Sequence, residues 1–181
     1  MIDKKEIFSI PNILCYLRIL LVPIFVYTFF IFEKDTHYIS VVILTVSSIT
    51  DFLDGYIARK YDMITELGKF IDPVADKLTQ ITVAIALIYK YPLYFWLAVI
   101  ILVKDLMLAI VGLVLLKKNG KHIDGAGMPG KIATCVFFIV SIVLLAVHVE
   151  IAIANILIYI TIFLMFIAMV YYGRSLYKMF K

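Results

Sequence analysis

Cysteine is scarce in this chain, and nothing in the sequence resembles a linker between domains. The 181 residues include only Cys15 and Cys135, both in apolar segments without the spacing of metal-binding thiols. We therefore expect two buried, reduced cysteines rather than a thiol metal centre. Because no repeat, low-complexity stretch or linker divides the chain, we expect a single domain over residues 1–181.

Apolar residues are abundant instead. They make up 64% of the chain and the mean hydropathy is +1.05, whereas a soluble domain is about half apolar. The sequence predicts an all-α integral membrane protein, a six-transmembrane-helix bundle with no room for a separate soluble domain. Residues 2–10 mix charged and apolar side chains, which predicts a short N-terminal interfacial segment. The predicted spans are 12–32, 38–57, 68–89, 93–116, 132–147 and 151–172.

Basic residues are distributed unequally between the two sides of this predicted bundle. With the N-terminus inside, the opposite side holds only Lys34 and Lys90, while Arg18, Lys77 and Lys104 lie within spans. The remaining lysines and arginines fall on the cytoplasmic side. The positive-inside rule thus predicts a multi-pass cell-membrane protein with both termini and the functional site cytoplasmic. This side should attract anionic membrane lipids, and no nucleic-acid motif is present.

Four aspartates, Asp51, Asp54, Asp72 and Asp76, lie in the second and third spans. Carboxylates at membrane depth are costly and usually functional. Spacings of three and four place each pair on one face of a helix, and the short connection between the spans lets the two faces meet. Such a cluster suits two hard divalent cations, Mg²⁺ or else Mn²⁺. The absence of histidine and cysteine from the cluster argues against zinc.

Phosphate chemistry is the natural use of metals held at a membrane surface. They would bind a diphosphate and stabilise a leaving group. Arg59 offers a fork for phosphate oxygens, and the small residues Gly55 and Ala58 let a ligand approach the backbone. Asp76 is our candidate general base. The simpler alternative is that the aspartates only pair with Arg59, Lys69 and Lys77 as helix-end charges. A cation transporter is the alternative of a different class.

The same residues resemble the signature of the CDP-alcohol phosphatidyltransferase family, D-x2-D-G-x2-A-R-x8-G-x3-D-x3-D. The resemblance covers all eight fixed positions, and it extends to the opening Ile10-Pro11-Asn12 with Arg18. The matching positions are Asp51, Asp54, Gly55, Ala58, Arg59, Gly68, Asp72 and Asp76.

The resemblance implies transfer of a phosphatidyl group from CDP-diacylglycerol to an alcohol, with release of CMP. It implies two metal ions on Asp51, Asp54, Asp72 and Asp76, with Asp76 as the general base. It also implies a homodimer. Residues implied in CDP and diphosphate binding are Asp51, Asp54, Gly55, Ala58, Arg59, Gly68 and Asp72.

The acceptor alcohol is predicted from the fourth span. Branches that use glycerol 3-phosphate usually carry Arg-Glu and a second arginine eight residues after the first, whereas this chain has Lys104-Asp105 and Gly112. The stretch 103–110 is more similar to the cardiolipin-forming branch, so we favour phosphatidylglycerol as acceptor, with glycerol 3-phosphate as the alternative. Candidates for contact with acceptor or lipid phosphate are Lys104, Lys131, Arg18 and Asn12. For the two lysines and Arg18, the simpler alternative is that the charged side chain extends to the lipid headgroups.

Overall fold

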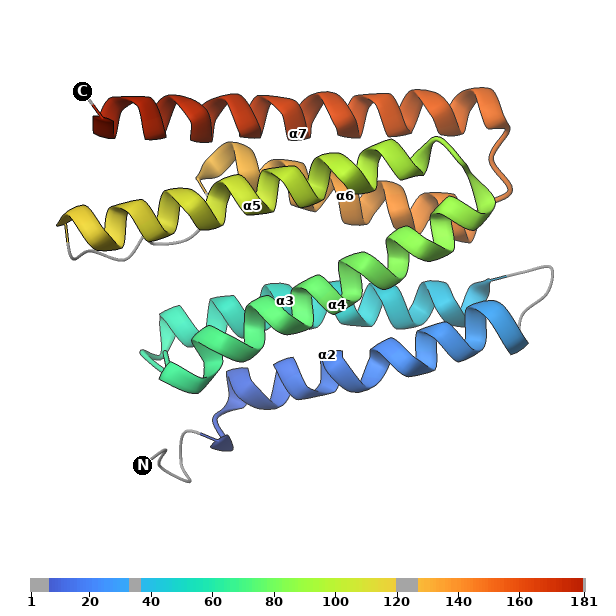
Figure 1. Cartoon of the computed structure of the whole chain (residues 1–181). Helices are drawn as coiled ribbons and strands as arrows, with labels where there is room; N and C mark the ends of the chain where they lie inside the picture. Colours follow the sequence, from blue (N-terminus) through green and yellow to red (C-terminus); the bar gives the residue numbers. More distant parts are fainter. Residues whose placement is uncertain (1–6, 33–36, 120–126, 181) are drawn as a thin grey trace. The chain divides into compact units, whose positions relative to one another are not determined.

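The computed structural model describes residues 7–32, 37–119 and 127–180, and the side chains of 111–119 and 175–180 are not described. This part of the chain is all-helical (Figure 1). It divides into two compact units, residues 1–89 with 145–148, and residues 90–144 with 149–181. Each unit is described by itself below.

The first unit contains the helices that carry the aspartates. They are α2 (Ile10–Tyr27), which a π-helical turn (Thr28–Phe32) extends, α3 (Tyr38–Lys60) and α4 (Glu66–Lys90). α2 packs along α3, and Leu21, Leu44 and Val83, one from each helix, line a common small apolar space. The second unit contains α5 (Tyr94–Asn119), α6 (Met128–Ala146) and α7 (Ile151–Phe180), with α5 beside α7.

Every predicted span lies in one of these helices, apart from single residues at an end, so the all-α class is confirmed. Within the described ranges, four helical stretches are long and apolar enough to cross a membrane: Ile10–Phe32, Tyr38–Lys60, Met128–Ala146 and Ile151–Arg174. Crossing by α4 and α5, and with it the six-span bundle, stays a prediction. The interfacial segment predicted over residues 2–10 falls mostly outside the described residues.

A proline and a threonine lie near the π-helical turn. Pro23 lies inside α2 and has no N–H to donate to the carbonyl of Ile19, one turn earlier. Five residues later, the Thr28 hydroxyl donates to the carbonyl oxygens of Ile24 and Phe25, 3.0 Å away in each case. The Ser40 hydroxyl of α3 donates in turn to Thr28, at 3.0 Å. These bonds satisfy polar groups within the helices and fix α2 against α3.

A tight turn brings the end of α3 to the start of α4. Asp62 adopts a left-handed backbone with φ of 53°, a conformation that aspartate tolerates better than most residues. The Met63 N–H donates to the Ala58 carbonyl at 2.9 Å, which closes α3 in the manner of a Schellman cap. The connection therefore needs only residues 61–65, and the first turns of α4 lie beside the last turns of α3.

Polar side chains also join the helices of the second unit. The Tyr94 hydroxyl lies 2.7 Å from the Ser141 hydroxyl, which donates to the Phe137 carbonyl at 2.6 Å. The Lys90 ammonium donates to the Leu144 carbonyl at 2.9 Å, where a cation neutralises the carbonyl end of α6. These contacts fix the start of α5 against the end of α6.

Candidate metal and diphosphate site

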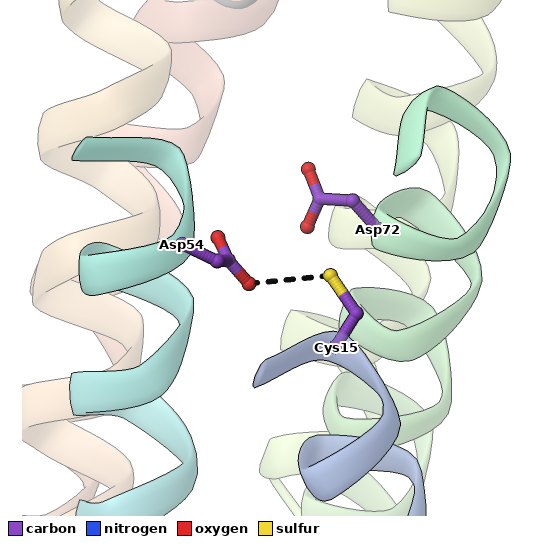
Figure 2. A group of neighbouring side chains, drawn as sticks. All are labelled: Cys15, Asp54 and Asp72. Carbon is purple, nitrogen blue, oxygen red and sulfur yellow. Dashed lines mark hydrogen bonds between the residues drawn. The ribbon is translucent and has the colours of Figure 1, made fainter. Parts of the chain in front are cut away.

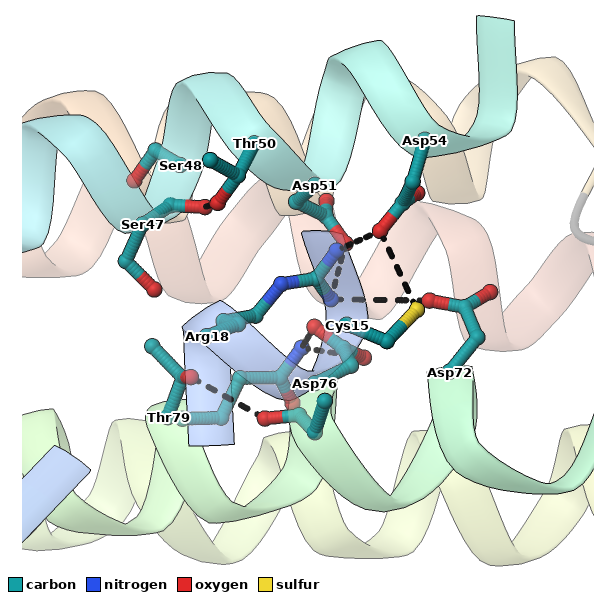
Figure 3. A network of polar contacts seen from close by, with 12 residues as sticks. Cys15, Arg18, Ser47, Ser48, Thr50, Asp51, Asp54, Asp72, Asp76 and Thr79 are labelled. Atoms are coloured by element: carbon teal, nitrogen blue, oxygen red, sulfur yellow. Dashed lines mark hydrogen bonds and ion pairs between the residues drawn. The ribbon is translucent and has the colours of Figure 1, made fainter. Parts of the chain in front are cut away.

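The four aspartates gather where α3 and α4 meet beside α2 (Figure 3). Asp51 and Asp54 lie on α3, and Asp72 and Asp76 lie on the first turns of α4. Asp54 is buried at 3% exposure, whereas the Asp72 side chain is 51% exposed. Asp54 is therefore the inner carboxylate of the cluster and Asp72 the outer one. A ligand can reach the cluster from the side of Asp72.

Arg18 of α2 enters this cluster. Its guanidinium pairs with Asp51 at 2.6 Å through Nη1, with Asp54 through Nη2, and more weakly with Asp72 at 3.5 Å. The Arg18 side chain is almost fully buried. The predicted contact of Arg18 with acceptor or lipid phosphate stays a prediction. The structure adds a contact that the sequence did not indicate, a cation shared by three of the four aspartates.

Asp76 has different neighbours from the other three aspartates. Both of its carboxylate oxygens accept hydrogen bonds from the Gln80 amide, at 2.9 Å each, and the Lys77 ammonium lies 3.7 Å from one of them. The Gln80 amide fixes the orientation of this carboxylate, and the Lys77 ammonium forms an ion pair with it. This environment suits the predicted general base.

The Cys15 thiol faces the same space. It donates to Asp54 Oδ2 at 3.4 Å, and the ligand atoms of Cys15, Asp54 and Asp72 lie within 4.8 Å of one another (Figure 2). Burial was correctly predicted for Cys15 and was wrong for Cys135, which is exposed. Cys135 shares a face of α6 with Ile132 and Ile139, both more than half exposed. An apolar membrane segment can turn such a face to lipid, so apolar surroundings in sequence do not ensure burial within the protein.

A hydrogen-bonded latch joins α2 to the N-terminus of α4. The Thr65 hydroxyl accepts the Gly68 N–H at 2.9 Å, which caps the first turn of α4, and it donates to Asn12 Oδ1 at 3.2 Å. Asn12 is buried at 1% exposure. Asn12 therefore lies beside the N-terminus of α4. Its predicted contact with phosphate stays a prediction.

Gly68 is required by this latch. A Cβ at Gly68 would lie 2.6 Å from Asn12 Oδ1 and 2.9 Å from Thr65 Oγ1, whereas a Cβ at Gly55 would lie 3.4 Å from the nearest atom, the tip of Arg59. Gly68→Ala should therefore lower the free energy of unfolding by roughly 1–3 kcal/mol. Gly55→Ala, the matched control, should be neutral or slightly stabilising because alanine favours helix. Thermal unfolding of the detergent-solubilised variants checks this, and equal effects would exclude the latch.

A cleft opens beside the cluster. Five of the eight motif positions line it. Residues of α2, α3, the connecting turn and α4 form its walls: Pro11, Asn12, Cys15, Asp54, Gly55, Ala58, Met63, Ile64, Thr65, Gly68, Lys69 and Asp72. The small residues Gly55, Ala58 and Gly68 leave room along the helix backbones. This is the space in which the predicted nucleotide and diphosphate would fit.

Arg59 lies at the edge of the same region. It belongs to the last turn of α3, its side chain is exposed, and its guanidinium folds back toward Gly55. Arg59→Lys should raise the Michaelis constant for the CDP-linked donor by about tenfold, because lysine keeps the charge and loses the two-pronged hydrogen bond to phosphate. Steady-state kinetics with varied donor measure this, with Lys60→Arg as control. An unchanged Michaelis constant would remove Arg59 from the diphosphate site.

The predicted acceptor lysines belong to the second unit. Lys104 on α5 is buried at 5% exposure; its ammonium lies 3.1 Å from Asp105 Oδ1 and 3.5 Å from Thr134 Oγ1 on α6. Lys131 lies one helical turn before Thr134 and is exposed. Lys104 on α5 thus reaches α6 at Thr134, one turn from Lys131. The predicted role of both lysines with phosphate stays a prediction.

Two residues at the site were missed by the sequence analysis. Gln80 follows Asp76 by four positions, and this helical spacing could have identified it as the partner of the carboxylate. Thr65 immediately precedes Glu66, the first residue of α4, and a threonine in that position is a typical N-cap. Both residues position others rather than offer new chemistry.

The acidic cluster has the donor set of a site for a hard divalent cation. Its carboxylate oxygens converge from two helices onto a position that already accommodates the positive charge of Arg18. The prediction that no cysteine belongs to the cluster was wrong, because the Cys15 thiol lies within 4.8 Å of ligand atoms of Asp54 and Asp72. The four carboxylates outnumber this one thiol, and oxygen ligands suit Mg²⁺ and Mn²⁺ better than zinc, which prefers nitrogen and sulfur. The residues present therefore fit the metal-dependent chemistry predicted from the sequence.

The sequence is similar to proteins of one known family. Residues 8–168 match the family model described as CDP-alcohol phosphatidyltransferase. A CDP-diacylglycerol–glycerol-3-phosphate 3-phosphatidyltransferase from Haemophilus influenzae is 38% identical over 92 residues, 51% of this chain and 49% of that protein. The enzyme of the same name from Rickettsia bellii is 43% identical over 82 residues, 45% of each chain.

A third relative carries a different name. A CMP-forming cardiolipin synthase from Streptomyces coelicolor is 30% identical over 137 residues, which cover 74% of this chain and 63% of that protein. The chain thus spans about half the length of the first two relatives and somewhat more of the third. Because the family match takes in all eight motif positions and both helices that carry the aspartates, the chain belongs to the CDP-alcohol phosphatidyltransferase family.

Proposed function

We propose that this protein transfers the phosphatidyl group of CDP-diacylglycerol to glycerol 3-phosphate and releases CMP. The observation that carries the proposal is the position of the acidic cluster, on helix ends that border a cleft lined by the small residues of the motif. In such a placement, carboxylates on one side can hold metal ions for a diphosphate, and the accessible backbone on the other side leaves room for the nucleotide.

Each residue of the motif has a proposed role in the transfer. Asp51, Asp54 and Asp72 would hold the divalent cations, with Asp76 completing the set, and the cations would neutralise the diphosphate. Arg59 would bind diphosphate oxygens at the rim of the cleft. Asp76, oriented by Gln80, takes the proton of the acceptor hydroxyl. The hydroxyl oxygen forms the new bond to the phosphorus that carries diacylglycerol, the bond from this phosphorus to CMP breaks, and CMP leaves.

The acceptor differs from the one that the sequence analysis favoured. Several relatives bear names that specify glycerol 3-phosphate, so phosphatidylglycerol is the less supported of the two acceptors. Phosphatidylglycerol remains the second candidate for a specific reason. The relative named as a cardiolipin synthase aligns with a larger share of the chain than the first two relatives do, and Lys104-Asp105 replaces the Arg-Glu pair expected for a free phosphate ester.

The location of this chemistry is part of the same proposal. The distribution of lysine and arginine supports a cell-membrane protein whose termini and acidic cluster face the cytoplasm. A homodimer and the choice between Mg²⁺ and Mn²⁺ also belong to the proposal.

A product assay tests the proposal. The purified protein receives CDP-diacylglycerol and Mg²⁺ with glycerol 3-phosphate in one reaction and phosphatidylglycerol in another, and both the lipid product and CMP are measured. We expect phosphatidylglycerol phosphate and an equal amount of CMP from the first reaction. Cardiolipin from the second reaction alone would identify phosphatidylglycerol as the acceptor. If the protein releases no CMP under any condition, the proposed transferase activity is contradicted, and a cation transporter becomes the better hypothesis.

A further inference from the structure

Arg18 is an unusual residue to find at the centre of a candidate metal site. Its side chain is 1% exposed, it contacts carboxylates from two other helices, and its Nε is buried without a hydrogen-bond partner among the described residues. Removing a guanidinium from water is costly unless nearby anions compensate. The contacts with Asp51, Asp54 and Asp72 supply that compensation.

The carboxylates around Arg18 need a positive charge nearby. Three carboxylates lie around one guanidinium, and Asp54 is itself nearly inaccessible to water. Like charges held this closely in a buried place repel one another strongly, so the fold needs a positive charge there. Arg18 provides one that is covalently attached to α2.

A divalent cation would use some of the same oxygen atoms. Arg18 Nη1 contacts Asp51 Oδ1, and Nη2 contacts Asp54 Oδ2. An oxygen that accepts a short hydrogen bond from a guanidinium has less electron density to offer a metal ion, and two positive charges at one place repel each other. The guanidinium and the metal ion are therefore competitors for the inner carboxylates.

We propose that Arg18 is a tethered counter-ion of the acidic cluster. It neutralises the inner carboxylates when no divalent cation is bound, and it gives up at least one of these contacts when a cation binds. Arg18 thereby stabilises the metal-free fold and lowers the affinity of the site for metal. This inference rests on the divalent-cation site of the proposed function, and it assigns Arg18 a role that does not require contact with either substrate.

The test uses metal binding and unfolding, without substrates. The detergent-solubilised protein is stripped with chelator and titrated with Mn²⁺ alone, and the free Mn²⁺ is quantified by electron paramagnetic resonance. Arg18→Gln should bind Mn²⁺ about tenfold more tightly than the unsubstituted protein, because close charge pairs couple at least this strongly. Arg174→Gln, the same change at an exposed arginine of α7, should leave the affinity unchanged.

Thermal unfolding gives the second readout. In chelator, Arg18→Gln should unfold roughly 10 °C lower than the unsubstituted protein, since it leaves buried carboxylates without their cation. Saturating Mn²⁺ should restore most of this loss, so the metal-induced rise in unfolding temperature is larger in the variant. Arg18→Lys should lie between the two, because lysine keeps the charge and loses the fork.

A charge-balanced variant covers the case in which Arg18→Gln does not fold. Arg18→Gln combined with Asp54→Asn removes both members of the buried pair and should be more stable in chelator than Arg18→Gln alone. If the double variant is as unstable as the single one or worse, Arg18 acts through packing and the counter-ion role is excluded.

The outcomes separate this inference from the proposed function. Mn²⁺ binding by the unsubstituted protein with equal affinity in Arg18→Gln would overturn the counter-ion role and leave the proposed metal site intact. If neither the unsubstituted protein nor any variant binds Mn²⁺, both the proposed metal site and the proposed competition between Arg18 and the metal ion are overturned. Tighter binding in Arg18→Gln, with metal-dependent recovery of stability, is the result that we expect.

Discussion

Asp76→Asn should reduce turnover by about 10³-fold or more while the protein still binds CDP-diacylglycerol. An amide cannot accept the proton of the acceptor hydroxyl, and a general base typically contributes about 10²–10⁴-fold to rate. The loss should exceed the effect of proton transfer alone to the extent that Asp76 also holds metal. Both carboxylate oxygens of Asp76 lie 2.9 Å from the Gln80 amide, so its orientation is well defined before substrate arrives.

The measurement is a CMP-release assay at saturating donor and acceptor, together with a separate binding assay for the CDP-linked lipid. Gln80→Glu is an informative companion, because it replaces the donor of both hydrogen bonds with a second carboxylate and should also slow turnover. Asp105→Asn, a matched change on α5, should have a much smaller effect. Turnover of Asp76→Asn within about tenfold of the unsubstituted enzyme would exclude Asp76 as the base.

Removal of divalent metal should abolish activity altogether. Four carboxylates with one buried arginine leave a negative cluster that repels a diphosphate. Excess chelator should therefore stop CMP release, and Mg²⁺ or Mn²⁺ added beyond the chelator should restore it. Ca²⁺ is the useful control, because it binds oxygen ligands with longer and less regular geometry and should restore little activity. Full activity in chelator would contradict a metal-dependent transfer.

The acidic cluster could be predicted from the sequence because helical spacing alone determines it. The spacing of three or four residues places each pair of aspartates on one face of its helix, whatever surrounds it. The turn between the two helices has only five residues, so the helix ends that it joins lie close together. The turn itself was predicted only as a short connection. Its left-handed Asp62 depends on capping bonds that the sequence does not display.

The contacts of Arg18 could not be predicted from helical spacing. Periodicity tells which face of its own helix Arg18 shares with Asn12, but it does not tell which other helix lies opposite that face. The structure places Asn12 against Thr65 and Arg18 against the aspartates, so two residues on one face have separate partners. The acceptor could not be predicted for a similar reason, since Lys104 and Lys131 lie on other helices and carry no spacing relationship to the motif.

The order of helices along the chain has a consequence for membrane insertion. An aspartate is costly within a membrane helix, and α3 brings two of them in its last ten residues. Arg18 lies on α2, which is synthesised first, so a partner of opposite charge is already in the bilayer when Asp51 and Asp54 arrive. The two helices would then enter lipid with one of these two negative charges balanced by Arg18, so the same ion pair would also lower the barrier to membrane insertion.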